Sequence, residues 1–337
     1  MKKIVIDCRY IGMSGIGRVL EGFITNLPSD NDFYFLGSKQ KLKEYGIENN
    51  IIEDDNYPVS KKGLFVTKEI NKYDAFFTPN FIIPYHVKID TYTMIHDLMF
   101  LDFKDTTNGF VDKVIKKHFY KRCIKKSKGI FTVSNFTKER IMHYYPKCKA
   151  NIILVYNGLS NSIIEYKKNN PKVTKEDYIL FVGNIKKQKG IKTLLEAIDN
   201  TDIKLYLVGE KDRFRTKDDT LTKYMDNPNI KFTGRISDEE LFNYLAKAKF
   251  LIQPSLYEGF GLPPLEALYL ETKPIISNID VFKEIYSNLD VEFFEAGNKD
   301  SLLEKIKSTN PIVDKNKNTD EKYSYKKGIE TIVESIK

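Results

Sequence analysis

The sequence predicts an α/β fold of two Rossmann-like domains, each built on a doubly wound parallel sheet. A chain of 337 residues favours two domains over one. Short apolar runs of strand type alternate with segments of helical spacing, which is the pattern of a parallel sheet with helices on both faces. The order of strand, glycine-rich loop and helix occurs twice, once from Lys3 and again from Tyr178. Because ligands bind such folds at the carboxyl ends of the strands, we expect the site in a cleft between the two domains.

The first domain opens with an apolar run at residues 3–8, a glycine-rich segment at 12–18 and helical spacing from 19 to 27. The glycine spacing differs from that of a dinucleotide fingerprint. The segment therefore either lets the backbone approach a phosphate or a sugar, or forms only a tight turn between strand and helix. Further strands are expected at residues 33–36, 75–77, 92–95, 129–133 and 152–155.

The second domain is expected after Asn157-Gly158, where the polar stretch 167–177 indicates a linker or a surface loop. A strand at 178–182, a basic loop at 183–190 and a helix at 191–198 then restart the pattern. Further strands are expected at residues 203–208, 230–233, 250–253 and 274–277. Residues 310–322 are polar and indicate a surface segment, and a last helix is expected at 325–336.

Composition excludes several classes of protein. Hydrophobic residues make up 41% of the chain and aromatic residues 13%, which is enough for substantial cores, yet no run of about 18 apolar residues could span a bilayer. A charged residue follows the first methionine too soon for a secretory signal peptide. The three cysteines and four histidines are scattered and fit neither a disulfide framework nor a zinc site. These features predict a protein of the reducing cytoplasm.

The net charge of +8 lies entirely in the first half of the chain. Residues 1–157 hold 25 Lys and Arg against 17 Asp and Glu, whereas the remaining residues hold 29 of each. Much of the excess lies between Asp112 and Lys128, and the apolar residues there predict a basic amphipathic helix. Such a helix suits an anionic membrane surface, although a lysine-rich solvated face has the same pattern. Binding to nucleic acid is the weaker interpretation, because no nucleic-acid motif accompanies the charge.

Glu258 and Glu266 stand eight positions apart, with a Gly-x-Gly turn and a Pro-Pro pair between them. The prolines suit the first turn of a helix, whose free N–H groups form a site for an anion such as a diphosphate. We expect Glu258 in the loop before this helix and Glu266 in its first turn. Each feature alone also has a purely structural explanation. Because the two glutamates, the glycine turn and the Pro-Pro pair occur together in one short segment, they favour two acids that bind sugar hydroxyls beside an anion site.

Three other segments are candidates for ligand contact. His96 should emerge at the carboxyl end of a strand, where it either donates to a substrate hydroxyl, stabilises a leaving group or is structural. Lys189 beside Gly190 lies at a strand-to-helix turn, where a lysine can meet a phosphate as a point charge. Ser237 and Glu240 have capping-box spacing, which explains them structurally. The backbone of the preceding residues, Gly234, Arg235 and Ile236, remains available to face a ligand.

Together these motifs resemble the family 4 retaining glycosyltransferases, which have the GT-B fold of two Rossmann-like domains, and the resemblance covers nearly the whole chain. Its most specific part is Glu258 to Glu266, which matches the E-x7-E motif of that family within the letters E-G-F-G-L-P. Within this family, the segment from Glu258 to Glu266 and the His96-Asp97 pair are most similar to bacterial mannosyl- and rhamnosyltransferases of surface-polysaccharide synthesis. The other matching segments are Ile6-Asp7-Cys8-Arg9 with Gly15-Ile16-Gly17-Arg18, Thr132 to Lys138, Asn157-Gly158, and Val182-Gly183 with Lys189-Gly190.

The resemblance implies a role for each candidate residue. Residues 1–157 would bind the acceptor, residues 158–322 would bind a nucleotide sugar, and residues 323–337 would form a helix that packs back on the first domain. Glu258 and His96 would face the reacting sugar as catalytic residues, Glu266 would hold the ribose, and Lys189 would neutralise the diphosphate. The remaining donor contacts would come from Gly183, Gly234, Arg235, Ile236, Gly259, Phe260, Gly261 and Leu262, and the acceptor or phosphate loop would comprise Gly15, Ile16, Gly17 and Arg18.

The chain departs from the family pattern in two places. Many relatives carry Arg at the position of Asn184 or at that of Gln188, so Lys186 or Lys187 would have to supply the second positive charge. After the helix of Glu266, the usual Gly-Thr-Pro is replaced by Glu271-Thr272-Lys273-Pro274, which changes the local turn. No metal would be needed, because positive side chains and a helix N-terminus offset the charge of the leaving diphosphate. The nucleoside diphosphate sugar would be a co-substrate, and no cofactor is expected.

The sequence therefore predicts a retaining, metal-independent transferase that moves a hexose, with mannose from GDP-mannose favoured, to a glycan acceptor. We expect a lipid-linked acceptor and peripheral attachment to the inner face of the cytoplasmic membrane. The alternatives are a UDP- or dTDP-sugar-dependent glucosyl- or rhamnosyltransferase, a nucleotide-sugar epimerase on the same fold, and a non-catalytic protein that binds membranes or nucleic acid.

Overall fold

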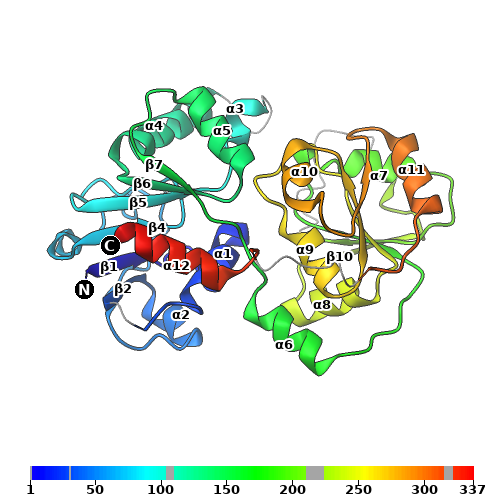
Figure 1. Ribbon diagram of the computed structural model, residues 1–337, viewed down its shortest axis with the longest axis horizontal. Helices are drawn as coiled ribbons and strands as arrows, with labels where there is room; N and C mark the ends of the chain where they lie inside the picture. Colours follow the sequence, from blue (N-terminus) through cyan, green and yellow to red (C-terminus); the bar gives the residue numbers. More distant parts are fainter. Residues whose placement is uncertain (1, 30–31, 104–109, 210–223, 315–321) are drawn as a thin grey trace. The chain divides into compact units, whose positions relative to one another are not determined.

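The computed structural model describes residues 2–29, 32–103, 110–209, 224–314 and 322–337, and the chain divides into two compact units. Unit 1 comprises Met1–Ser160 together with Lys322–Lys337, and unit 2 comprises Asn161–Glu321 (Figure 1). Part of the polar segment expected at 310–322 lies outside the described residues.

Unit 1 contains one sheet, in which every described strand runs parallel to its neighbours. The strand order is β3-β2-β1-β4-β5-β6-β7, so the chain winds first to one side of β1 and then to the other. Each strand predicted for this domain is present, and β3 is a short edge strand that the sequence pattern did not reveal. The strands are β1 (Lys3–Asp7), β2 (Asp32–Gly37), β3 (Ile51–Glu53), β4 (Ala75–Thr78), β5 (Asp90–Ile95), β6 (Gly129–Thr132) and β7 (Asn151–Leu154).

The first helix of unit 1 begins earlier than predicted. Gly12 has a φ of +74° and makes the turn, and Met13 is extended and caps α1 (Ser14–Ile24). The Gly17 N–H donates to the Met13 carbonyl at 2.8 Å, so the helical hydrogen bonds start there. The prediction of a loop from Gly15 to Arg18 was therefore wrong, because these residues form the first turns of α1. The other helices described in unit 1 are α2 (Lys39–Glu44), η1 (Lys68–Lys72), α3 (Met99–Asp102), α4 (Phe110–Lys126), α5 (Asn135–Tyr144) and α12 (Tyr325–Ile336).

The last helix, α12, lies beside α1 in unit 1 (Figure 1). The Tyr325 ring fills the space where Gly22 has no side chain, since a Cβ there would lie 2.3 Å from a ring carbon. Phe23 meets the same ring edge-on at 5.5 Å between centroids. At the other end of α12, Lys2 Nζ donates to the Ile336 carbonyl at 2.7 Å, which brings both ends of the chain together. The C-terminal segment is thus part of the N-terminal fold.

The basic helix α4 forms close to its predicted position, but its apolar residues do not share one side. Phe119, Tyr120 and Cys123 are buried, whereas Val114 and Ile115 are about half exposed, at 48% and 49%. The single apolar face expected for an amphipathic helix was therefore a wrong prediction. The helix packs through its C-terminal half and leaves aliphatic side chains among lysines near its start.

Unit 2 repeats the doubly wound topology with one parallel sheet in the order β10-β9-β8-β11-β12-β13. The predicted strands are present here too, and the additional strand β13 again lies at an edge. The strands are β8 (Ile179–Val182), β9 (Leu205–Val208), β10 (Ile230–Gly234), β11 (Phe250–Gln253), β12 (Lys273–Ser277) and β13 (Glu292–Phe294). The described helices are α6 (Asn161–Asn169), η3 (Lys187–Lys189), α7 (Ile191–Ile198), α8 (Asp238–Lys247), α9 (Leu262–Tyr269), α10 (Asp280–Tyr286) and α11 (Lys299–Ser308).

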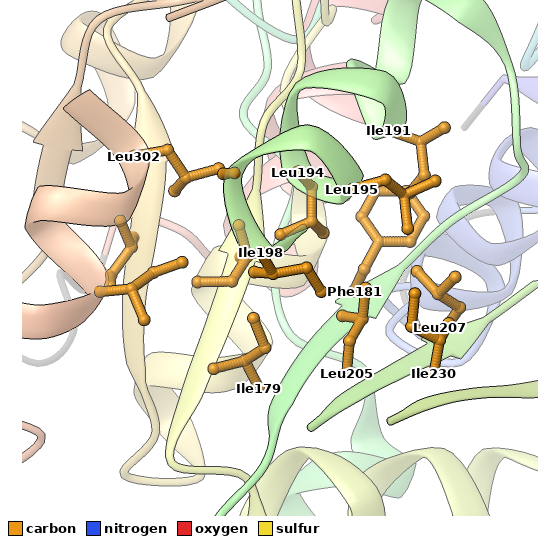
Figure 2. Close-up of a cluster of buried hydrophobic side chains, with 14 of the residues drawn as sticks. Ile179, Phe181, Ile191, Leu194, Leu195, Ile198, Leu205, Leu207, Ile230 and Leu302 are labelled. Carbon is orange, nitrogen blue, oxygen red and sulfur yellow. The ribbon is translucent and has the colours of Figure 1, made fainter. Parts of the chain in front are cut away.

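The core of unit 2 explains why α7 is fixed against the sheet. Figure 2 shows Leu194, Leu195 and Ile198 of α7 lying over side chains of the strands, among them Phe181 and Leu205. Leu194, Leu195 and Leu205 are fully buried. Burying a side chain of this size contributes about 1.5–3 kcal/mol. The loop between β8 and α7 is thus anchored at both ends, and this loop carries Lys189.

Candidate active site

The strand order of unit 2 reverses between β8 and β11, which lie side by side. At such a switch point the loops after the two strands diverge and leave a crevice at the carboxyl edge of the sheet. The loop after β8 carries Lys189, and the loop after β11 carries Glu258. The topology therefore brings these two predicted site residues to the position where doubly wound sheets bind their ligands.

Lys189 and Glu258 form a direct ion pair. Lys189 Nζ lies 2.5 Å from Glu258 Oε1, and the two side chains are only 22% and 11% exposed. Ser255 Oγ donates to the same carboxylate oxygen at 2.7 Å, and Gln253 Nε2 donates to Ser255 Oγ at 3.1 Å. Ser255 and Gln253 are completely buried. Ser255 and Gln253 therefore hold the Glu258 carboxylate in one position, beside the Lys189 ammonium.

The two loops are also joined through their backbones. Leu256 N donates to the Gln188 carbonyl at 2.8 Å. Gly190 has a φ of +64°, and a Cβ at this position would lie 1.8 Å from the carbonyl oxygen of Pro254. Only glycine combines this backbone conformation with so close an approach. These contacts fix the distance between Lys189 and Glu258.

Helix α9 begins as predicted but one turn too early for Glu266. Gly261 precedes the helix in a left-handed conformation, and prolines occupy its first turn. Tyr286 Oη donates to the Gly261 carbonyl and holds this start in place. Because α9 already begins at Leu262, the placement of Glu266 in its first turn was wrong, and Glu266 lies in the second turn. Glu266 is only 3% exposed, so little of it is open to solvent.

The carboxyl ends of three adjacent strands in unit 2 carry glycines. Gly183 follows β8, Gly209 follows β9, and Gly234 ends β10. Gly209 N donates to the Gly234 carbonyl at 3.1 Å, and an added Cβ on Gly234 would meet open space. Glycines leave the backbone open to the close approach of a ligand at such a position. Arg235 is exposed, Ile236 is half-buried, and the capping box of Ser237 and Glu240 is confirmed.

The lysines of the loop after β8 differ in their positions. Lys186 and Lys187 are exposed, whereas Lys189 is half-buried beside Glu258. Gln188 is buried, so a charged group at this position would need a partner to offset the cost of its burial. Lys189 is thus the lysine of this loop that the fold places beside Glu258 at the switch point.

In unit 1, His96 follows β5, as expected. Its Nε2 lies 2.8 Å from the Pro79 carbonyl oxygen. A carbonyl only accepts, so Nε2 carries the proton of the neutral ring and Nδ1 is an acceptor. Burial lowers the pKa of His96, which favours this neutral form. The ring is therefore suited to accept a hydrogen bond at Nδ1 rather than to donate one from that nitrogen.

Asp7 and Arg9 form a buried structural pair at the end of β1. Arg9 Nε and Nη2 donate to the two carboxylate oxygens of Asp7 at 2.8 and 2.7 Å. Arg9 Nη1 also donates to the Gly63 carbonyl at 2.8 Å. The Arg9 side chain is 2% exposed and the Asp7 side chain 0%, so the pair anchors the turn before α1. The first turns of α1 contain Gly15, Ile16, Gly17 and Arg18.

Sequence reasoning missed Gln253, Ser255 and Gly209. Ser255 lies three positions before Glu258, and this spacing in a turn is the one signal that could have identified it. Val208-Gly209 repeats the Val182-Gly183 pattern at a strand end, which would have identified Gly209. The sequence around Gln253 contains no such signal.

Within the described residues, no three His, Cys, Asp or Glu side chains are placed so that they could hold a metal ion. No helix within the described residues is both long enough and apolar enough to cross a bilayer.

Comparison with known proteins supports both the fold and the family. The family described as glycosyl transferases group 1 matches residues 162–333, about half of the chain. The O-antigen chain mannosyltransferase RfbU of Salmonella typhimurium is 29% identical over 197 residues, which cover 58% of this chain and 54% of that protein. O-antigen chain mannosyltransferase B of Escherichia coli is 25% identical over 224 residues, or 61% of this chain and 58% of that protein. The matched region thus spans little more than half the length of these relatives.

The fold resembles a solved structure over the whole chain. Sucrose-phosphate synthase from Thermosynechococcus elongatus superposes with a TM-score of 0.68 at 15% identity, covering 100% of this chain and 95% of that one. At this identity the likeness shows the fold alone, namely the GT-B fold with its two Rossmann-like domains. Together with the match over residues 162–333, it shows that the chain belongs to the group 1 glycosyltransferases.

Proposed function

We propose that this protein is a retaining, metal-independent hexosyltransferase that transfers mannose from GDP-mannose to a glycan acceptor. The observation that carries the proposal is the pair of Lys189 and Glu258 at the switch point of unit 2, next to the start of α9. A cation and a helix N-terminus suit a diphosphate, and a carboxylate suits sugar hydroxyls. The mannose preference draws support from the names of the two O-antigen mannosyltransferases above.

Each donor contact follows from the chemistry of the side chain. Lys189 and the N–H groups at the start of α9 receive the diphosphate, and they offset the charge that develops as it leaves. Glu258 accepts hydrogen bonds from the sugar hydroxyls, and Glu266 accepts from the ribose. Gly183 and the segment from Gly234 to Ile236 border the nucleobase. With these groups in place, the charge of the leaving diphosphate requires no metal.

The fixed position of Glu258 supports a positioning role over a nucleophilic one. Its Oε1 is already engaged by Lys189 and Ser255. We propose front-face attack, in which the acceptor oxygen bonds to the anomeric carbon on the side from which the diphosphate departs. The bond from that carbon to the phosphate oxygen breaks, and a phosphate oxygen takes the proton of the acceptor hydroxyl. In unit 1, His96 is suited to accept a hydrogen bond from a sugar hydroxyl at Nδ1.

We further propose that the acceptor is lipid-linked and that unit 1 binds an anionic membrane through the start of α4. Val111, Val114 and Ile115 are exposed by 69%, 48% and 49%. Lys117 and Lys121 are exposed on the same helix. Exposed aliphatic side chains among lysines suit the interface of an anionic bilayer. Such attachment would hold the enzyme at the membrane surface, where a lipid-linked acceptor is anchored.

An aromatic pair extends this surface. Phe65 is 53% exposed and stacks on Tyr85 at 5.2 Å between centroids. Tyr85 contacts α4 twice, because its hydroxyl lies 3.0 Å from His118 Nε2 and its ring lies under Arg122. Amphipathic aromatic rings are favoured at membrane interfaces. The membrane surface we propose thus comprises α4 and this neighbouring pair.

The test is a donor screen with the full chain. Thermal shifts are measured with GDP, UDP, dTDP and ADP, and transfer is then measured with the matching sugar nucleotides and a lipid-extract acceptor. Stabilisation by GDP follows mass action and is expected at concentrations above its Kd. Conversion of the donor without an acceptor would indicate an epimerase, stabilisation by UDP or dTDP alone would indicate a different donor, and no response to any nucleotide would contradict the proposal.

A further inference from the structure

We infer that Glu258 serves as the counter-ion of Lys189 before the donor binds and thereby makes the site prefer a nucleotide sugar to the nucleoside diphosphate product. This inference rests on the proposed function, and it assigns a specificity role to a contact within unit 2. Lys189 Nζ lies 2.5 Å from Glu258 Oε1. Within the described residues this carboxylate is the sole ion-pair or hydrogen-bond partner of the Lys189 ammonium.

The pair is built into the fold rather than formed by two mobile side chains. Ser255 and Gln253 are completely buried and direct hydrogen bonds towards Glu258 Oε1. Lys189 is fixed by the loop contact between Gln188 and Leu256 and by the tight turn at Gly190. Glu258 therefore cannot swing away from Lys189 without breaking buried hydrogen bonds.

A diphosphate that enters this crevice meets a neutral pair and not a free cation. Lys189 attracts it, but the Glu258 carboxylate repels it at nearly the same distance. For a nucleoside diphosphate this repulsion has no compensation, because the ligand lacks the sugar hydroxyls that would donate to Glu258. The free product also carries more negative charge than the nucleotide sugar, since its terminal phosphate is not esterified.

A nucleotide sugar changes the balance. The hydrogen bonds described for Glu258 all use Oε1, so Oε2 is left to accept from sugar hydroxyls. Hydroxyl donors at Oε2 offset the negative charge of the carboxylate, which weakens its attraction for the ammonium on Oε1 and leaves Lys189 better able to attract the diphosphate. The sugar thus completes the site, and loss of the sugar on transfer restores the repulsion and favours release of the product.

Isothermal titration calorimetry on the full chain tests this inference with GDP and GDP-mannose as probes, or with UDP and UDP-glucose if that pair is the one that binds. The variant Glu258→Gln removes the charge and keeps the shape. We expect it to bind the nucleoside diphosphate on the order of tenfold more tightly than wild type, a change of about 1.4 kcal/mol. We expect it to bind the nucleotide sugar more weakly, so the preference between the two ligands reverses.

The control variant Glu239→Gln removes an exposed carboxylate in the first turn of α8 and should leave both affinities unchanged. Glu258→Ala, checked for folding by its melting temperature, should also bind the diphosphate more tightly. If both Glu258 variants bind it as weakly as wild type or more weakly, the inference is wrong while the proposed function stands. If no nucleotide or nucleotide sugar binds wild type, the proposed function fails and the inference fails with it.

Discussion

Gly190 lies so close to Pro254 that a Cβ on Gly190 would be 1.8 Å from the Pro254 carbonyl oxygen. This contact ties the loop of Lys189 to the loop of Glu258. Gly190→Ala must therefore separate the loops and also adopt a strained φ of +64°. We expect a loss of more than about 2 kcal/mol in the free energy of unfolding, measured by urea denaturation.

Gly46→Ala is the matched control, because Gly46 has a φ of +75° and an added Cβ there meets nothing within 4 Å. It should show the cost of backbone strain alone, about 1 kcal/mol. Equal losses in the two variants would mean that the contact with Pro254 does not constrain the loops.

The buried pair of Asp7 and Arg9 gives a second prediction about stability. Arg9→Met leaves the Asp7 carboxylate buried with its main partner removed. Breaking such a pair costs about 3–5 kcal/mol. The double variant Asp7→Asn with Arg9→Met should recover part of that loss in urea denaturation. A loss below about 1 kcal/mol in Arg9→Met would show that the pair does not anchor the end of β1.

The half-buried ring of His96 predicts a dependence of stability on pH. Burial lowers its pKa below the ordinary value of about 6.5. Above about pH 6.5 the ring is neutral in both states; below it, the unfolded chain binds a proton that the folded ring resists, so the free energy of unfolding falls. His96→Gln should lose less stability than wild type between pH 7.5 and pH 5.5, measured by urea denaturation. His143→Gln, an exposed control, should follow wild type, and identical pH profiles for all three proteins would refute the prediction.

The start of α4 gives a prediction about membrane binding. The double variant Val114→Ser and Ile115→Ser removes two half-exposed aliphatic side chains. We expect a several-fold loss of co-sedimentation with phosphatidylglycerol vesicles, because the binding strength scales with the apolar area inserted. Ile312→Ser, at a 74% exposed position of unit 2, should bind like wild type. Equal binding to neutral phosphatidylcholine vesicles would contradict the part assigned to the lysines.

The sequence predicted the two sheets well because buried parallel strands form continuous apolar runs bounded by turns. It missed β3 and β13, edge strands of three residues each, which are too short to show a period. It placed Glu266 and the segment from Gly15 to Arg18 one turn out of position, because helix ends depend on cap geometry that residue types do not settle.

The site was predictable only in part. The motif around Glu258 and the glycine beside Lys189 indicated which residues matter, but their direct contact depends on two strands distant in sequence becoming neighbours. The support from Ser255 and Gln253 likewise arises from tertiary packing, and the role of a buried glutamine cannot be inferred from its neighbours in the chain.

The central claim is that Lys189 binds the diphosphate of a sugar donor, and the most direct measurement is the rate of mannose transfer from GDP-mannose to a lipid-extract acceptor by Lys189→Ala. Lys192→Ala, which removes a 55% exposed lysine from α7, is the matched control. We expect Lys189→Ala to lose a factor of about 10² to 10³ in turnover, comparable to the loss of one group that stabilises a developing negative charge, and Lys192→Ala to keep wild-type turnover. Transfer by Lys189→Ala at the wild-type rate would contradict the claim.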